Sequence, residues 1–173
     1  FISTREGYLP PMSNLSKRDK VSLCYGYGLQ TTLLELVNAY SIFYSEGKLR
    51  PLSLIVNNSS EDTEQIISPD LSIKMKDMLT DAVRKGTGSK AKVKGIDISG
   101  KTGTVQKLGE KGYKEVSHNA LFIGQASSEN RNLIVGIIVR DAQKNGSGGG
   151  DVAAPSFARF INKVYSNQIC YEF

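Results

Sequence analysis

Apolar residues recur at helical spacing over residues 32–46 and predict an amphipathic helix there. Its apolar stripe consists of Leu33, Leu36, Val37, Tyr40 and Phe43. Thr32 at the start, with Glu35 in the first turn, forms a capping-box pattern, and Gly47 is a usual stop signal. The residues before this helix are rich in turn formers, so we expect irregular connections over residues 1–30.

A second stretch with the same spacing predicts a helix from Ser68, as its cap, to the turn formers at residues 86–88. Pro69 fits the first turn, where a missing N–H costs nothing. The apolar stripe consists of Leu71, Met75, Met78, Leu79, Ala82 and Val83. Between the two helices, residues 50–56 predict an extended run and residues 57–63 a polar loop.

The second half of the chain predicts three strands, over residues 96–106, 119–124 and 133–139. The last two are almost continuously apolar, which indicates that both faces of their sheet are covered. The polar residues 127–132 form a turn between them. We therefore expect the three strands to form an antiparallel meander.

A last helix is expected after the glycine-rich residues 146–150. Asp151 is placed to cap it, and Pro155 lies in its first turns. Its apolar stripe consists of Ala153, Phe157, Phe160, Ile161 and Val164. The order of elements predicts an α+β fold, in which helices pack on an antiparallel sheet in one piece.

Composition and charge exclude several function classes. The formal net charge is +5, but Lys and Arg are scattered and accompany no nucleic-acid-binding module, so we expect no nucleic-acid partner. Cys24 and Cys170 are far apart and His118 is the one histidine, which argues against a zinc site. We expect no metal and no cofactor, and the pairing of the two cysteines stays open. No stretch approaches the roughly 20 apolar residues that span a bilayer.

The most informative stretch for chemistry is residues 98–105, where glycines stand just before Lys101 and two positions after it. Glycine weakens a strand, so two of them suggest that another backbone or a ligand approaches closely. Gly103 leaves room for an extended ligand to pair with the strand edge. Lys101 would place a positive charge beside that ligand, and the hydroxyls of Thr102 and Thr104 could bond a carboxylate.

Strand geometry sets a condition on this site. Regular alternation puts Lys101 on the opposite face of the sheet from Thr102 and Thr104. All three side chains can serve one ligand only if the strand lies at a sheet edge or is locally distorted.

The triplet Lys101-Thr102-Gly103 is accompanied by further motifs that together cover nearly the whole chain. The segments are Gly26-Tyr27-Gly28-Leu29, Thr31 with residues 33–40, Gly47 with Pro51, Gly86-Thr87-Gly88, Gly100-Lys101-Thr102-Gly103-Thr104, and residues 120–124, 141–143 and 149–157. In this order they resemble the class B penicillin-binding proteins, most closely the septal, division-specific peptidoglycan D,D-transpeptidases. The resemblance implies that residues 1–173 are the C-terminal portion of a single transpeptidase domain of the penicillin-binding, β-lactamase-like fold.

The resemblance also implies acyl transfer through a serine acyl-enzyme. The serine attacks the D-Ala-D-Ala end of a peptidoglycan stem peptide and passes the acyl group to a neighbouring amine, and β-lactam antibiotics acylate the same serine. By resemblance, Lys101 supports proton movement and the local electrostatics. Thr102 and Thr104 bind the substrate carboxylate beside Gly103, and the backbone N–H of Thr104 joins the oxyanion hole. The parent would be anchored in the inner membrane, face the periplasm and work with membrane proteins of the division complex.

The family's S-x-x-K and S-x-N motifs precede the lysine strand, and here the formal matches fall elsewhere. Residues 89–92 satisfy S-x-x-K, but they lie in the basic loop just before Lys101 without an apolar helix behind them. Residues 128–130 satisfy S-x-N, but they lie in the hairpin turn after it. We interpret both as coincidences. Thr32 and Ala142 also replace typical prolines, which affects local turn geometry.

We therefore expect the nucleophilic serine to belong to the missing N-terminal half of the same domain, upstream of Phe1, and this chain alone to be inactive. An alternative is a non-catalytic remnant or scaffold module with the same fold. A serine β-lactamase shares the lysine strand, but the other motifs resemble transpeptidases instead.

Overall fold

The computed structural model describes residues 7–53, 63–109, 112–129, 131–142 and 148–166. Its main sheet is antiparallel, in the order β3-β4-β5, and is formed by β3 (Asp97–Gly109), β4 (Gly112–Ser128) and β5 (Arg131–Ala142). A small antiparallel ribbon is formed by β1 (Lys48–Leu49) and β2 (Glu64–Gln65). The predicted meander is confirmed, and all three strands are longer than expected.

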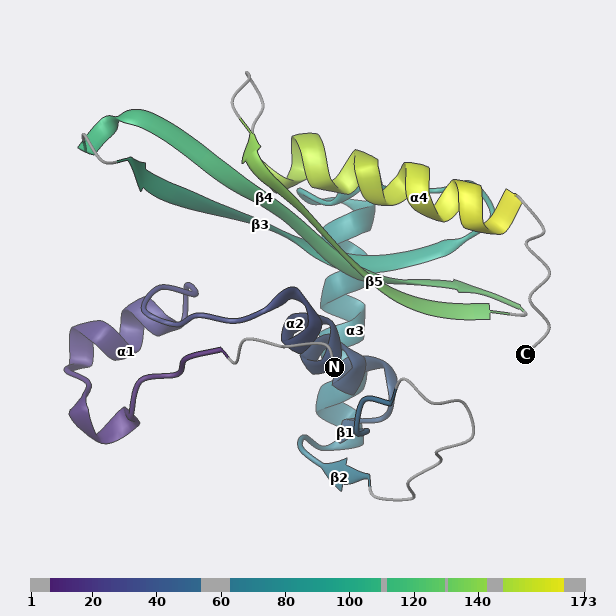
Figure 1. The fold of residues 1–173 in the computed structure, drawn as a ribbon. Coiled ribbons are helices and arrows are strands. Elements are labelled where there is room, and N and C mark those ends of the chain that lie inside the picture. Colours follow the sequence, from purple (N-terminus) through teal and green to yellow (C-terminus); the bar gives the residue numbers. More distant parts are fainter. Residues whose placement is uncertain (1–6, 54–62, 110–111, 130, 143–147, 167–173) are drawn as a thin grey trace.

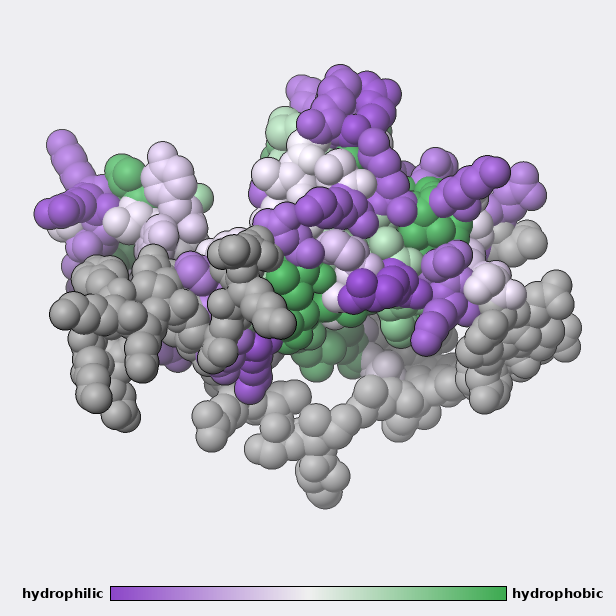
Figure 2. All heavy atoms as spheres, turned by 90° about the horizontal axis from the view of Figure 1, so that it is seen from above, coloured by the Kyte–Doolittle hydropathy of each residue, from purple (hydrophilic) through white to green (hydrophobic). Residues whose placement is uncertain are grey.

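Helices pack on both faces of this sheet, as the apolar strands predicted. They are α2 (Leu33–Ser41), α3 (Pro69–Arg84) and α4 (Ala154–Ser166), whereas α1 (Lys17–Leu23) buries none of its residues. Figure 1 shows α4 along one face of the sheet and α2 on the opposite side, while α3 runs across the strand direction. In Figure 2, hydrophobic residues gather in the central part of the molecule with mostly hydrophilic residues around them. The predicted α+β fold is confirmed.

The predicted capping box at the start of α2 is present. The backbone N–H of Glu35 donates to Thr32 Oγ1 at 3.2 Å, and that of Thr32 donates to Glu35 Oε2 at 2.7 Å. The α-helix ends earlier than expected, at Ser41, and residues 42–44 continue it as a 3-10 turn. Gly47 then takes a φ of 83°, a left-handed conformation that suits glycine.

Two predictions for irregular or extended segments were wrong. Residues 1–30 contain α1, which Ser16 caps through a reciprocal pair of hydrogen bonds with Asp19. None of the residues of α1 is buried, so no apolar stripe marks this helix and only its cap could have indicated it. Residues 50–53 form no strand, and residues 54–62 of the expected extended run and polar loop lie outside the described residues.

The face that α3 buries differs from the predicted stripe. Leu79 and Val83 are buried as expected, whereas Leu71 and Met78 are 44% and 61% exposed. The buried residue in the first turns is Ser72, whose hydroxyl donates to the carbonyl oxygen of Phe43 at 3.0 Å. A polar contact with the 3-10 turn after α2 therefore accompanies this rotation of α3, which apolar spacing could not reveal.

The start of the last helix also differs from the prediction. A π-helical turn, Gly149–Ala153, precedes α4, and Asp151 does not cap it with its side chain. The Asp151 carboxylate instead forms an ion pair with Lys90. Ala153, Phe157 and Ile161 are buried as predicted, because they face the sheet.

Phe122 of β4 is the centre of the core. Its ring is fully buried and lies 4.7 Å from the ring of Phe157, centroid to centroid, which joins α4 to the sheet. Gly100 and Gly124 are directly opposite each other in β3 and β4. A Cβ at Gly100 would lie 2.8 Å from Phe122 Cζ, so the ring covers the backbone of this glycine pair. No larger residue fits under it.

The glycine pair generates a stability prediction. A Cβ at Gly124 would lie 2.3 Å from the carbonyl oxygen of Ser99, and this backbone atom cannot move aside without breaking the ladder. We expect Gly124→Ala to lower the free energy of unfolding by about 2–3 kcal/mol, measured by urea denaturation. Gly103→Ala is the matched control, because its Cβ would meet only Leu121 at an ordinary 3.5 Å. Equal losses for the two variants would contradict this account.

Glu35 generates a prediction on pH. Hydrogen bonds from the backbone N–H groups of Thr32 and Gly7 lower the pKa of Glu35 from 4.5 to about 2. A lowered pKa means that the ionised carboxylate stabilises the fold above pH 4.5 and that this contribution disappears as the pH falls towards 2. We expect Glu35→Gln to reduce the fall in melting temperature over this range, with Asp77→Asn as the control. Parallel melting curves for wild type and Glu35→Gln would refute the assignment.

Candidate active-site strand

Lys101, Thr102 and Thr104 can serve one ligand only if their strand lies at a sheet edge or is distorted. The structure shows an edge strand without a distortion at these residues. Within the described residues β3 pairs only with β4, and the register runs without a shift from Asp97 to Lys107. Lys101 is exposed, and its Nζ donates to the carbonyl oxygen of Thr102 at 3.1 Å and to Thr102 Oγ1 at 3.3 Å. The amine therefore leans over the open edge towards the face that carries the threonines.

The same contact fixes the direction of the backbone at this edge. In an antiparallel ladder, successive residues point their N–H and C=O alternately towards the neighbouring strand and away from it. The Thr102 carbonyl, which accepts from the Lys101 amine, points away from β4. Thr104 has the same phase, so its N–H also faces the open edge, where it can donate to a ligand.

The hydroxyls of Thr102 and Thr104 are held by segments from outside the sheet. Thr104 Oγ1 accepts the backbone N–H of Gly149 at 3.0 Å, and Thr102 Oγ1 lies 2.7 Å from Thr87 Oγ1. A Cβ at Gly149 would lie 2.5 Å from the carbonyl oxygen of Gly103, so the turn before α4 rests directly on the strand. The structure thus brings Lys101, Thr102 and Thr104 together.

Gly103 differs from the other glycines of the sheet. An added Cβ would make only an ordinary contact of 3.5 Å with Leu121. Packing within the described residues therefore does not require glycine here. The absence of a side chain matters at this position only if something approaches the strand edge from outside.

On the face that carries Lys101, the half-buried Tyr44 anchors the preceding residues of β3. The Tyr44 hydroxyl donates to the carbonyl oxygen of Ser99 at 3.2 Å and accepts from Ser99 Oγ at 3.0 Å. Burial raises the pKa of Tyr44 to about 12, so it stays a neutral donor. The residues just after α2 thereby hold β3 two positions before Lys101.

An ion pair joins the two loops that flank the threonine side of the strand. Lys90 Nζ lies 2.7 Å from Asp151 Oδ1, with the side chains 58% and 46% exposed. An exposed pair of this kind contributes about 1 kcal/mol or less. Its effect is to hold the loop after α3 beside the turn before α4.

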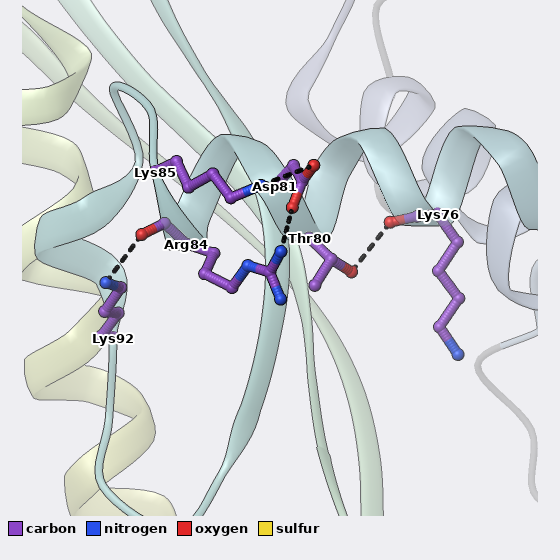
Figure 3. Close-up of polar contacts among 6 residues, drawn as sticks. All are labelled: Lys76, Thr80, Asp81, Arg84, Lys85 and Lys92. Atoms are coloured by element: carbon purple, nitrogen blue, oxygen red, sulfur yellow. Dashed lines mark hydrogen bonds and ion pairs between the residues drawn. The ribbon is translucent and has the colours of Figure 1, made fainter.

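The formal S-x-x-K match at residues 89–92 does not form the family's helix start. Ser89 begins a single 3-10 turn, Ser89–Ala91. The amine of Lys92 donates to the carbonyl oxygen of Arg84 at 2.9 Å, as Figure 3 shows next to the Asp81 pairs with Arg84 and Lys85. The structure agrees with the interpretation of this match as a coincidence.

The chain contains two further formal matches to these motifs. Ser45-Glu46-Gly47-Lys48 satisfies S-x-x-K and Ser117-His118-Asn119 satisfies S-x-N. Ser45 follows α2 and donates its hydroxyl to the carbonyl oxygen of Ser41 at 2.8 Å, so it does not begin a helix. Ser128 of the other S-x-N match donates to the carbonyl of Arg131 at 3.5 Å within the hairpin, and its Asn130 lies outside the described residues.

The remaining candidates do not gather at this edge. Within the described residues no cluster of three His, Cys, Asp or Glu side chains could hold a metal ion. Cys24 is an exposed free thiol, and Cys170 lies outside the described residues. None of the described helices is both long and apolar enough to cross a membrane. A hollow of about 500 Å³ is lined by Tyr44, Pro51 and Ile134, among others, and includes none of Lys101, Thr102 and Thr104. The candidate site is therefore identified by its functional groups and not by a cavity.

Comparisons with known proteins show what this chain is similar to. A family model described as "Penicillin binding protein transpeptidase domain" matches residues 1–162. The "Probable peptidoglycan D,D-transpeptidase PbpC" of Pseudomonas aeruginosa is 33% identical over 159 residues, which cover 91% of this chain and 28% of that protein. "Peptidoglycan D,D-transpeptidase FtsI" of Buchnera aphidicola is 32% identical over 171 residues, covering 95% of this chain and 30% of that protein.

A solved structure shares the fold. The apo transpeptidase domain of Burkholderia pseudomallei penicillin-binding protein 3 superposes with a TM-score of 0.81 at 28% identity, covering 94% of this chain and 50% of that one. The chain spans less than a third of the length of the two curated relatives and half of this solved domain. The match along 1–162 and the matching fold lead to one conclusion: this chain belongs to the penicillin-binding protein transpeptidase domain family.

Proposed function

We propose that the chain is the C-terminal part of a serine-type peptidoglycan D,D-transpeptidase that cross-links stem peptides in septal wall synthesis and is acylated by β-lactams. The observation that carries the proposal is the convergence of Lys101, Thr102 and Thr104 at the open edge of β3. The names of the relatives support the reaction, and the FtsI relative supports the septal role. The parent would act at the periplasmic side of the inner membrane with other division proteins.

The hydroxyl of Thr104 suits a carboxylate ligand. A threonine hydroxyl has one hydrogen to donate and lone pairs that accept. The backbone N–H of Gly149 occupies the acceptor side of Thr104 Oγ1, which favours donation of its hydrogen to a ligand. The ammonium group of Lys101 adds a positive charge on the same edge, so a D-alanyl carboxylate or its β-lactam counterpart would meet both.

The backbone of the edge suits the acyl group. The outward N–H of Thr104 can donate to the oxygen that becomes negative when a carbonyl is attacked, as an oxyanion hole requires. An extended peptide can pair with the outward groups of Thr102 and Thr104, main chain to main chain. Gly103 has no side chain that would block the approach of such a peptide to the strand.

The proposal places the nucleophile on another segment of the parent. Acyl transfer needs an activated serine beside the Lys101 edge, and the formal S-x-x-K match at 89–92 turns its lysine towards Arg84. We infer that an upstream segment of the parent supplies the S-x-x-K helix and the S-x-N motif. The chain itself would supply the wall of the cleft formed by β3.

Labelling with fluorescent penicillin tests the proposal. We expect the full-length parent to give a saturable band that survives denaturation and the 173-residue chain alone to give none. In the parent, Lys101→Ala should lower the rate of labelling by about 100-fold or more, because proton transfer at the serine loses its support. Lys76→Ala, on the exposed side of α3, should leave the rate unchanged.

The outcomes separate the alternatives. A covalent band with the chain alone would show that it carries its own nucleophile and would refute the proposed division of the domain. An unlabelled parent, or a native start near Phe1 in the genomic sequence, would favour the non-catalytic scaffold. In-frame S-x-x-K and S-x-N motifs upstream would favour the enzyme.

A further inference from the structure

The turn that follows α3 reaches the edge of β3 through one side chain. Thr87 is exposed, and its Oγ1 lies 2.7 Å from Thr102 Oγ1, although the two residues are 15 positions apart. We propose that Thr87 is a third hydroxyl of the carboxylate-binding edge and determines how well the site binds a ligand carboxylate. This inference rests on the proposed function and adds a residue to it.

The backbone of Thr87 is fixed on both sides. The N–H of Gly88 donates to the carbonyl oxygen of Ala82 at 3.0 Å, and a Cβ on Gly88 would lie 3.3 Å from the ring of Phe122. On the other side, a Cβ on Gly150 would lie 2.6 Å from the carbonyl oxygen of Thr87. The core and the turn before α4 therefore hold Thr87 in place, with its hydroxyl directed to Thr102.

The donors on this edge form a chain that starts at the ammonium group. Lys101 Nζ donates to Thr102 Oγ1 at 3.3 Å, which fills an acceptor position of that hydroxyl. The single hydrogen of Thr102 can then point to Thr87 Oγ1. The hydrogen of Thr87 is left as the end of the chain, polarised by the charge of Lys101.

In this arrangement the three threonine hydroxyls have different hydrogen-bonding roles. Thr104 can donate directly, because Gly149 fills its acceptor side. Thr102 accepts a hydrogen bond from Lys101 and can donate one to Thr87. The Thr87 hydroxyl is then the last donor of this chain of hydrogen bonds. A carboxylate at the edge would take hydrogen bonds from Thr87 and Thr104, and bonds to a charged acceptor are stronger than those to a neutral one.

A purely structural role of Thr87 makes a different prediction. If its hydroxyl only tied the turn to the strand, its loss would affect all ligands alike through a displaced Thr102. If it binds the carboxylate, its loss should affect only ligands that carry that charge. Benzylpenicillin and its neutral methyl ester differ in this group, so the pair separates the two roles.

The experiment measures acylation of the full-length parent by benzylpenicillin and by its methyl ester. We expect Thr87→Val to lower the second-order acylation rate constant about tenfold for benzylpenicillin and less than twofold for the ester. Thr87→Ser keeps the hydroxyl and should retain most of the wild-type rate. Thr80→Val is the control, because Thr80 Oγ1 bonds the carbonyl oxygen of Lys76 on the exposed side of α3 (Figure 3).

Several results would overturn the inference. Equal losses for the acid and the ester would assign Thr87 a structural role, as would a Thr87→Ser variant as slow as Thr87→Val. Unchanged rates would show that Thr87 has no part in binding. A wild-type parent that neither compound acylates would instead overturn the proposed function, and this inference with it.

Discussion

The packing of Phe122 over the glycine pair of β3 and β4 is the constraint on which the rest of the structure depends. Gly100 and Gly124 carry no side chains, so the Phe122 ring lies directly on the backbone, and the Phe157 ring packs against it at a tilt of 57°. This contact sets the distance between α4 and the sheet. It therefore also sets where the turn at Gly149 meets the strand, and the geometry of the site derives from the packing of the core.

The proposed chemistry depends on the position of β3 at an edge of the described sheet. Along a regular strand, the Lys101 side chain points to one face of the sheet and those of Thr102 and Thr104 point to the other. In a strand with neighbours on both sides, the three could not contact one ligand. At the edge of the described sheet, the Lys101 amine reaches round to Thr102 while the Thr104 backbone points outward. The hydroxyls are oriented by residues of two other segments, Thr87 and Gly149. One open strand thus presents charge, hydroxyls and backbone donors together.

Features encoded over a few residues were predictable, and features that depend on distant partners were not. The capping box of Thr32 and Glu35 is complete within one turn, so the start of α2 was correct. The buried face of α3 was partly wrong because Ser72 bonds to Phe43, 29 positions away. The role of Asp151 was wrong because its partner, Lys90, is 61 positions away.

The sequence by itself determined the family, the three-stranded sheet and the strand that carries Lys101, because motif order and hydrophobic period are properties of neighbouring residues. Only the tertiary structure decided that this strand lies at an edge and that Thr87 touches Thr102. It also decided that the turn at Gly149 orients Thr104. These contacts join segments far apart in the chain. They form only once the core has packed, and no local pattern records them.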